Sequence, residues 1–343
     1  MLQVQALKLK VLYVSSSVGL GHVTRDYRLS RLLGWADVTW LTAGRAARYL
    51  EARAERLHEL SRELRSLGDS IMNVIKDCRV TFSPIGLARL YLDLRRNSRA
   101  IAERLDLEDF DMVIGDEPWE LMMSGLSLPQ KSVLITDITS LGSSANYVSR
   151  RVNSWVLKSF HRFTLRFNVG LWGDGEGFLR YGQIPTHESY PEPEEGDYVV
   201  INIGGTDAGL RLARQLEEHL TKVGMDVVTL GGENFVSDPT KVVAKAKALV
   251  ALAGYGSLVE ASIMRKRAVI LKIDKHFEHN ENARLFEGRK GYRVLSCSEA
   301  TPERVYNALL QVLREDPQPP LLRDASYDIA SEIERLASQD SLT

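Results

Sequence analysis

The chain has 343 residues, of which 44% are hydrophobic and 26% are charged, and its formal net charge is −1. This predicts a folded soluble protein long enough for two domains. No run of about 18 uncharged apolar residues is present and the N-terminus lacks the layout of a signal peptide, so we expect a cytoplasmic protein without a transmembrane helix.

The charge is distributed unevenly along the chain. Residues 1–168 carry a net charge of +6, and residues 169–343 carry −7. A basic first half fits a domain that contacts an anionic partner, for which a lipid phosphate or a membrane surface is one candidate. The alternative is ordinary solvated helix faces, because 45–65 and 89–104 both read as amphipathic helices with outward arginines.

The first half alternates apolar runs with helical stretches, which predicts a parallel sheet. Between the first strand and a helix over 24–33 lies a loop with Gly19, Gly21 and His22. This loop lacks the third glycine and the distal acid of a dinucleotide-binding fingerprint. His22 and Arg25 share a helix face, and a histidine titrates near neutral pH and suits a general base. The alternative is a histidine that caps the helix. Expected strands are 10–14, 38–41, 111–114, 132–135 and 169–172.

Acidic residues follow two of these strands. Asp116 and Glu117 come after the third strand, and Asp137 comes after the fourth. Because ligands of parallel sheets bind beyond the carboxyl ends of the strands, these side chains are candidates for orienting His22 or an acceptor hydroxyl. They fit equally well as helix N-caps and first-turn acids.

An aromatic and basic helix is expected over 152–167. Such a helix fits a membrane surface, and it fits a core contact more simply. An acidic, proline-bearing segment over 181–196 then reads as a linker into a second domain. The two cysteines, Cys78 and Cys297, have no CxxC or histidine neighbour, and we expect neither a disulfide framework nor a metal site.

The second half repeats the alternation and carries two glycine turns. Strands are expected over 198–203, 226–230, 248–252 and 268–271, with helices over 210–219 and 326–337. Glycines allow close approach of the backbone to a phosphate, and a helix N-terminus offers free N–H groups, so both turns predict contacts with a nucleotide diphosphate. The residues of these turns are Gly204, Gly205 and Thr206, and then Gly254, Gly256, Ser257 and Leu258 with the carboxylate Glu260.

The order of these parts resembles the GT-B glycosyltransferases, and most closely family 28, which includes the N-acetylglucosaminyltransferase that makes lipid II. The resemblance implies an α/β fold of two Rossmann-like, doubly wound domains that face each other across a cleft. Residues 1–168, joined by the C-terminal helix 324–343, would form the acceptor side. Residues 169–323 would bind the nucleotide-sugar donor.

The same resemblance assigns roles to single residues. Glu260 matches the position that holds the ribose, and Glu278 and His279 match the glutamine pair that contacts the donor sugar, followed by Asn282. His279 departs from the family pattern, as does the Thr186-His187 pair where several relatives carry an arginine. Neutralisation of the diphosphate would then depend on helix ends or on Lys272 and Lys275.

These inferences predict an inverting, metal-independent hexosyltransferase with His22 as base. UDP-N-acetylglucosamine or a related UDP-hexose would be the donor, with no cofactor, no metal ligand and no nucleic-acid partner. A glycan or lipid-linked acceptor is expected, with membrane contact at the cytoplasmic face as a further expectation. Two alternatives stay open: a non-hydrolysing UDP-sugar epimerase on this fold, and a binding subunit without activity.

Overall fold

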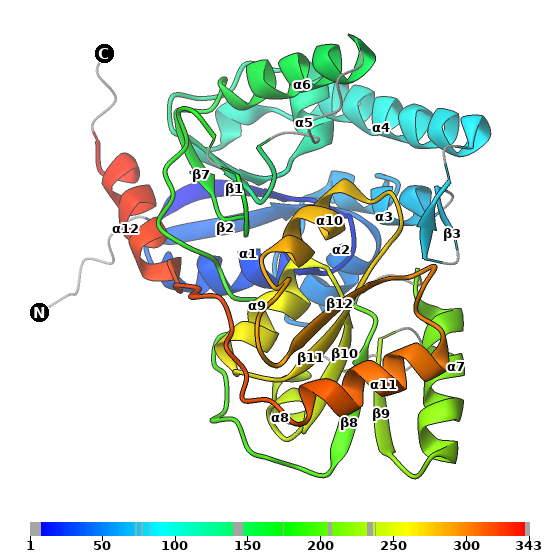
Figure 1. Ribbon diagram of the computed structural model, residues 1–343. Helices are drawn as coiled ribbons and strands as arrows, with labels where there is room; N and C mark the ends of the chain where they lie inside the picture. The colour runs from blue at the N-terminus through cyan, green and yellow to red at the C-terminus, as the bar shows by residue number, and fades with distance from the viewer. Residues whose placement is uncertain are drawn as a thin grey trace, which may run out of the picture.

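The computed structural model describes residues 8–72, 74–76, 78–81, 83–139, 147–173, 175–204, 208–231, 236 and 238–339. Two five-stranded sheets organise the chain, with strand orders β2-β1-β5-β6-β7 and β12-β11-β10-β8-β9, and a short hairpin β3-β4 forms a third. Figure 1 shows the two sheets in separate halves, each covered by its own helices. All strands within the two large sheets are parallel.

The first half holds the sheet that contains the N-terminal strand. Its strands are β1 Leu9–Ser15, β2 Ala36–Leu41, β5 Met112–Asp116, β6 Ser132–Thr136 and β7 Leu165–Asn168, and its hairpin strands are β3 Ile75–Lys76 and β4 Arg79–Val80. Its helices are α1 Gly21–Leu32, α2 Gly44–Glu51, α3 Leu67–Ile71, α4 Pro84–Arg104, α5 Trp119–Ser124 and α6 Tyr147–Phe160, with 3-10 turns Glu59–Arg62 and Leu107–Asp109.

The second half is built in the same way. Its strands are β8 Tyr198–Asn202, β9 Asp226–Leu230, β10 Ala248–Leu252, β11 Ala268–Lys272 and β12 Tyr292–Ser296. Its helices are α7 Leu210–Lys222, α8 Thr240–Ala244, α9 Tyr255–Ile263, α10 Phe277–Arg284 and α11 Pro302–Val312, and the last helix is α12 Ser326–Ala337.

The central strands are buried on both faces, which explains their continuous apolar sequences. Every residue of β6 and of β10 is buried. Parallel strands covered by helices on both sides have no solvent face and therefore show no polar alternation. Because all strands of a sheet point the same way, the loops after β1, β5 and β6 lie at one edge of the first sheet.

The last helix returns to the first half. α12 packs against α1, and its Ile329 and Ile333 belong to the same core cluster as Val11 and Tyr13 of β1. Arg28 of α1 stabilises the contact between α12 and the first half. Its guanidinium donates to the carboxylate of Asp324 and, at 3.2 Å, to Ser326 Oγ. Figure 1 shows α12 beside the first half.

Three predicted elements are wrong: two helices end earlier than expected, and one expected strand is not a strand. The helix expected over 152–167 ends at Phe160, and strand β7 begins at Leu165, because pairing with β6 from Val133↔Leu165 outweighs the helical spacing of the aromatic residues. The strand expected over 169–172 is therefore a connection after β7. The helix expected over 45–65 ends at Glu51, shortly before Ala54, which has a left-handed φ of 56°.

The aromatic side chains of the α6 region pack into the core. Phe160, Phe163 and Phe167 are buried, whereas Trp155 is 38% exposed. The core contact thus explains most of the aromatic pattern. Within the described residues, no helix has the length and apolarity needed to cross a membrane.

Candidate active site between the two halves

His22 lies in the first turn of α1, where the glycine loop ends. Gly19 adopts a left-handed φ of 71°, and a Cβ on Gly21 would meet no atom within 4 Å. The N-cap residue of α1 is Leu20, and no side chain caps it. The imidazole of His22 instead turns towards the end of β5, with Nδ1 3.2 Å from Asp116 Oδ1. The capping alternative for His22 is therefore wrong.

Arg25 is the centre of a buried ionic cluster. Its Nε and Nη2 lie 2.6 Å from the two oxygens of Asp116, and its Nη1 lies 2.9 Å from Asp137 Oδ2. The guanidinium is 1% exposed and Asp116 is 0% exposed. One arginine on α1 therefore binds the carboxylates that follow β5 and β6, and it also contacts His22 Nδ1 at 3.0 Å.

The charge of this cluster sets its protonation states. Burial would raise the pKa of Asp116, but Arg25 and His22 hold that pKa well below its ordinary value. Burial opposed by the same two groups leaves the pKa of Asp137 lowered as well. Both carboxylates are therefore ionised at neutral pH.

Glu117 behaves in the opposite way. Burial and the charge of Asp137 raise the pKa of Glu117 well above its ordinary value. Its Oε1 accepts from Thr136 Oγ1 at 3.0 Å, and its Oε2 lies 3.9 Å from His22 Nε2. Glu117 has a left-handed φ of 44°. The site thus holds one carboxyl group with a raised pKa beside two with lowered pKa values.

In the second half, the turn before α9 provides the expected glycines. Gly254 is the N-cap of α9, without a side-chain cap, and Gly256 lies in the first turn, where a Cβ would approach Thr186 Cγ2 to 3.1 Å. Ser257 follows, and Leu258 is fully buried. The first N–H groups of α9 therefore keep their capacity to bind an anion.

Glu260 is held in place by the two residues that depart from the family pattern. Its Oε1 accepts from Thr186 Oγ1 at 3.2 Å and lies 3.1 Å from His187 Nε2. Among the described residues, no group bonds Glu260 Oε2, which is left for a ligand. Thr186 and His187 thus fix the carboxylate that the sequence assigns to the ribose, a role that sequence reasoning missed.

The turn after β8 is only partly described. Gly204 has a left-handed φ of 72°, and its N–H donates to Asn202 Oδ1 at 2.9 Å. The predicted donor-binding residues Gly205 and Thr206 lie outside the described residues.

Helix α10 brings Glu278 towards the first half. Burial, with the charge of Asp137 next in size, raises the pKa of Glu278 to about 7. Asn282 Nδ2 donates to Glu278 Oε1 and to the Ala253 carbonyl, both at 3.2 Å, and this links α10 to the turn before α9. Glu278 is therefore held near the ionic cluster by a residue that the sequence also singled out.

His279 takes a structural bond. Its Nδ1 accepts from the Ile273 N–H at 3.3 Å, and burial, together with the charge of His276, holds the pKa of His279 well below its ordinary value. A neutral ring with Nδ1 as acceptor carries its proton on Nε2. His279 can thus offer a ligand only a donor group.

A cavity of about 130 Å³ joins the two halves. It is bounded on one side by the α1 loop and on the other by the turns before α7, α8 and α9. Predicted residues that it brings together are Gly21, Gly204, Gly256, Ser257 and Glu260. A contact beside it reinforces the junction, because the guanidinium carbon of Arg25 lies 4.9 Å from the ring centroid of Tyr255. Tyr255 is a further residue that sequence reasoning missed.

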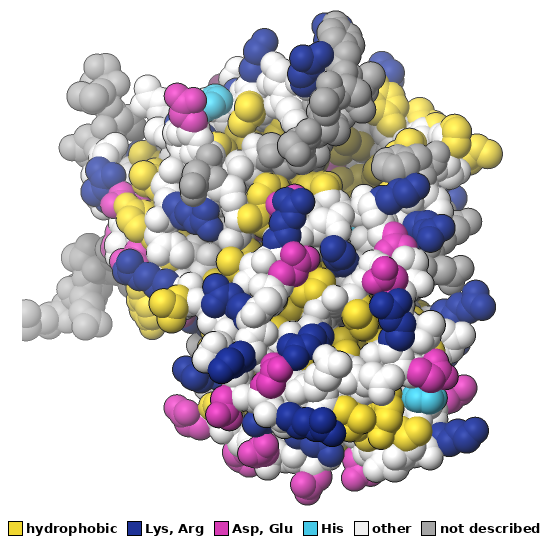
Figure 2. Space-filling model, viewed as in Figure 1, with side chains coloured by type: hydrophobic (Ala, Val, Ile, Leu, Met, Phe, Trp, Pro, Cys, Tyr) yellow, Lys and Arg dark blue, Asp and Glu magenta, His cyan; other side chains and the backbone are white. Residues whose placement is uncertain are grey.

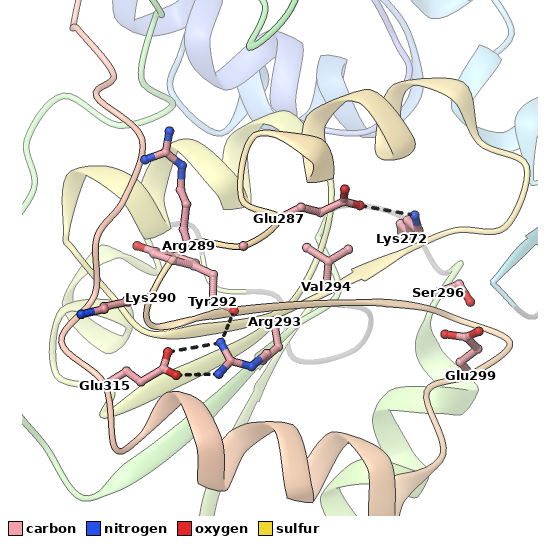
Figure 3. A pocket seen from close by; sticks show the side chains of 11 residues that line it. Lys272, Glu287, Arg289, Lys290, Tyr292, Arg293, Val294, Ser296, Glu299 and Glu315 are labelled. Atoms are coloured by element: carbon pink, nitrogen blue, oxygen red, sulfur yellow. Dashed lines mark hydrogen bonds and ion pairs between the residues drawn. The ribbon is translucent and has the colours of Figure 1, made fainter.

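Lys272, which the sequence offered as a partner of the diphosphate, lies outside the cavity at Glu260. A larger cavity of about 750 Å³ is lined by Lys272, Arg293 and their neighbours, and it shares no lining residue with the cavity at Glu260. Figure 3 shows Lys272 facing Glu287, at 3.8 Å, and Arg293 facing Glu315, at 2.5 Å. These two cations are already paired, whereas the smaller cavity is lined by Gly21, the residue next to His22, and by the carboxylate of Glu260. We therefore assign the chemistry to the smaller cavity.

The described residues contain no group of three or more histidine, cysteine or acidic side chains placed to hold a metal ion. The described part of the site thus consists of ionic and hydrogen-bonding side chains and of helix N–H groups.

Comparison with known proteins finds one family model and several similar solved structures. Residues 188–339 match the glycosyltransferase family 28 C-terminal domain. No curated protein matches the chain. Three similar solved structures are MurG from Acinetobacter baumannii, the glycosyltransferase SsfS6 from Streptomyces sp. SF2575 complexed with thymidine diphosphate, and UGT89C1 from Arabidopsis thaliana complexed with UDP-L-rhamnose.

These structures are 14% identical to the chain, with TM-scores of 0.56, 0.54 and 0.56. Each match covers 95% of this chain, and it covers 99%, 99% and 94% of the three relatives, respectively. At such identity the similarity shows only the fold of the whole chain. The chain has the GT-B fold of glycosyltransferases, and its residues 188–339 match the glycosyltransferase family 28 C-terminal domain.

Proposed function

We propose that the chain transfers a hexose, with N-acetylglucosamine as the first candidate, from a UDP-sugar to an acceptor hydroxyl, with inversion and without a metal ion. The observation that carries this proposal is the His22–Asp116 contact in one half, beside a cavity closed by Glu260 and the α9 turn of the other. We further propose that residues 1–168 and 324–343 bind the acceptor and that residues 169–323 bind the donor.

The geometry around His22 supports its role as the base. In the tautomer in which Nδ1–H donates to Asp116 Oδ1, the contact of Nδ1 with Arg25 is not a hydrogen bond, and Nε2 is unprotonated and free to accept the proton of an acceptor hydroxyl. The acceptor oxygen then attacks the anomeric carbon as the bond to the diphosphate breaks. A single displacement inverts that carbon, and the ionised Asp116 stabilises the imidazolium that forms.

The leaving diphosphate would be stabilised by the second half. Free N–H groups at Gly256 and Ser257, in the first turn of α9, lie at the positive end of the helix dipole. Fixed donors of this kind stabilise charge that grows in the transition state. Glu278 and Asn282 would contact the sugar, and a protonated Glu278 both donates and accepts, as a glutamine amide does.

The donor proposal is tested by calorimetric titration with UDP, dTDP, GDP and their sugars. We expect micromolar binding of a UDP-sugar by the wild type. Glu260→Ala should weaken it by about 1–3 kcal/mol, because a buried hydrogen-bond partner of the ribose is lost.

Glu218→Ala is the matched control, since Glu218 is an exposed glutamate of the same half and should leave binding unchanged. Absence of nucleotide binding by the wild type would contradict the proposal. Product analysis then separates transfer from epimerisation, because an epimerase changes the UDP-sugar without an acceptor and releases no UDP.

We also propose that the acceptor is lipid-linked and that α4 contacts the membrane surface. This helix exposes Ile85, Leu87, Tyr91 and Leu92, with exposed fractions of 82%, 41%, 52% and 61%. Exposed arginines accompany them, including Arg89. Figure 2 shows hydrophobic side chains gathered at the upper right of the molecule, over α4, with basic side chains nearby. A basic amphipathic face of this kind binds anionic lipid.

Sedimentation with vesicles tests this contact. We expect the wild type to bind vesicles of phosphatidylglycerol and phosphatidylcholine at low salt, and to bind less at high salt, because screening weakens the arginine contribution. Replacing both Ile85 and Leu92 with serine should reduce binding at least about threefold, since two apolar side chains no longer enter the interface. Leu321→Ser, at a fully exposed leucine of the other half, should change nothing. Equal binding of all three proteins would contradict the proposal.

A further inference from the structure

The two cysteines of the chain, which the sequence suggested to be unrelated, lie together in the structure. Cys78 belongs to the turn between β3 and β4 in the first half, and Cys297 follows β12 in the second half. Both belong to one hydrophobic cluster beneath the second sheet, and both line one cavity of about 300 Å³. Both are free thiols, and the Cys78 side chain lies close enough to Cys297 to be the largest influence on the pKa of its thiol.

Backbone hydrogen bonds join the hairpin that contains Cys78 to the second half. The Cys78 N–H donates to the Ala208 carbonyl at 3.1 Å, the Asp274 N–H donates to the Cys78 carbonyl at 3.0 Å, and the Val80 N–H donates to the Asp274 carbonyl at 2.9 Å. Ile75 of the same hairpin packs into the core of the second half. Cys78 is therefore held in position for its partner.

We propose that Cys78 and Cys297 form a disulfide bond that fastens the two halves together when the protein meets a small organic disulfide. The Cys297 thiolate attacks one sulfur of the reagent, and one thiolate of the reagent leaves. The Cys78 thiolate then attacks the mixed disulfide at the Cys297 sulfur and releases the second thiolate. Two protein thiols lose their protons and are oxidised, and the reagent is reduced to two thiols.

Accessibility gives the order of these steps. Both cysteines line the cavity, but Cys297 is partly exposed and Cys78 is buried, so Cys297 is the more accessible thiol and reacts first with the reagent. The interaction with the Cys78 side chain, followed by burial, raises the pKa of the Cys297 thiol. A thiolate with a raised pKa is scarce at neutral pH, so the reaction should be slow at pH 7 and faster at pH 9.

Oxidised glutathione is the reagent for the test, with thiol alkylation and peptide mass spectrometry as the readout. We expect the intact protein to lose two hydrogen atoms in mass, with one peptide pair linked through Cys78 and Cys297. The thermal unfolding midpoint of the oxidised protein should rise by roughly 5 °C, because the bond closes a very long loop.

Cys297→Ser and Cys78→Ser are the controls. Neither should form the linked pair or gain thermal stability, and Cys297→Ser changes only a partly exposed side chain, so that it keeps the fold. Two alkylatable thiols after oxidation at pH 9, a stable glutathione adduct on Cys297, or a dimer linked between chains would each overturn the proposal. If the oxidised wild type had an unchanged thermal unfolding midpoint, the proposal that the disulfide bond stabilises the contact between the two halves would be wrong.

Discussion

Replacing Arg25 with methionine is expected to lower the free energy of unfolding by about 3–5 kcal/mol at pH 7. Methionine keeps much of the volume but removes the charge. Asp116 and Asp137, both buried, would then face each other without a counter-ion. The loss is large because an unpaired buried carboxylate costs more than its ion pair contributes.

The deficit of this variant should shrink as the pH falls. In the wild type, the pKa values of Asp116 and Asp137 are lowered, so their stabilising contribution is present above the unfolded pKa of about 4 and is lost as the pH falls towards the folded values. In the variant, burial raises both pKa values, and stability is lost as the pH rises above about 4. The two proteins therefore differ most near neutral pH.

Urea unfolding at pH 7 and at pH 5 measures this difference in the first unfolding transition. Arg99→Met is the matched control: Arg99 lies on the exposed side of α4, 2.6 Å from Glu103, and its side chain is 80% exposed. An exposed pair contributes less than about 1 kcal/mol. Equal midpoints for the two variants at pH 7 would contradict the role given to the Arg25 cluster.

Arg25 also illustrates how far the sequence could predict the site. The apolar run of β10 marks its strand to the residue, because a buried parallel strand admits no polar alternation. The bounds of β9, an edge strand that is only partly buried, were also predicted to the residue. The rule that ligands bind beyond the carboxyl ends of strands correctly grouped His22, Asp116 and Asp137. These predictions depend only on local sequence patterns, namely apolar runs and the polar residues that directly follow them.

Other features depend on contacts between distant segments. Arg25 and its partners are 91 and 112 residues apart, so the choice of Arg25 as the common counter-ion follows only from the fold. β7 was missed because its pairing with β6 overrides a helical spacing of aromatic residues. The proximity of Cys78 and Cys297 depends on a hairpin of the first half that packs against the second half, and no local sequence motif predicts that contact.

The second large effect is expected at His22. His22→Ala should lower kcat by about 10²–10⁴-fold, the range that a positioned general base contributes, while the affinity for the nucleotide sugar stays within about twofold. The reason is that the imidazole contacts Asp116 and lies on α1, whereas the proposed donor contacts come from α9 and α10. Asp116→Asn should also lower kcat, since an amide cannot stabilise the imidazolium as a carboxylate does.

UDP release from the UDP-sugar identified by calorimetry, with and without acceptor, measures these rates, and the same titration measures donor affinity. His161→Ala is the matched control, because His161 is an exposed histidine of the same half and should keep full activity.

The effects on kcat and on donor affinity together distinguish a base from a binding residue. A structural or donor-binding role for His22 would weaken donor affinity, fold stability, or both. If His22→Ala retained more than about a tenth of the wild-type kcat, the proton of the acceptor would have to leave by another group. Because Asp137 is paired with Arg25, and burial raises the pKa of Glu117 well above its ordinary value, that group would be Glu278, whose pKa of about 7 leaves it partly ionised at neutral pH.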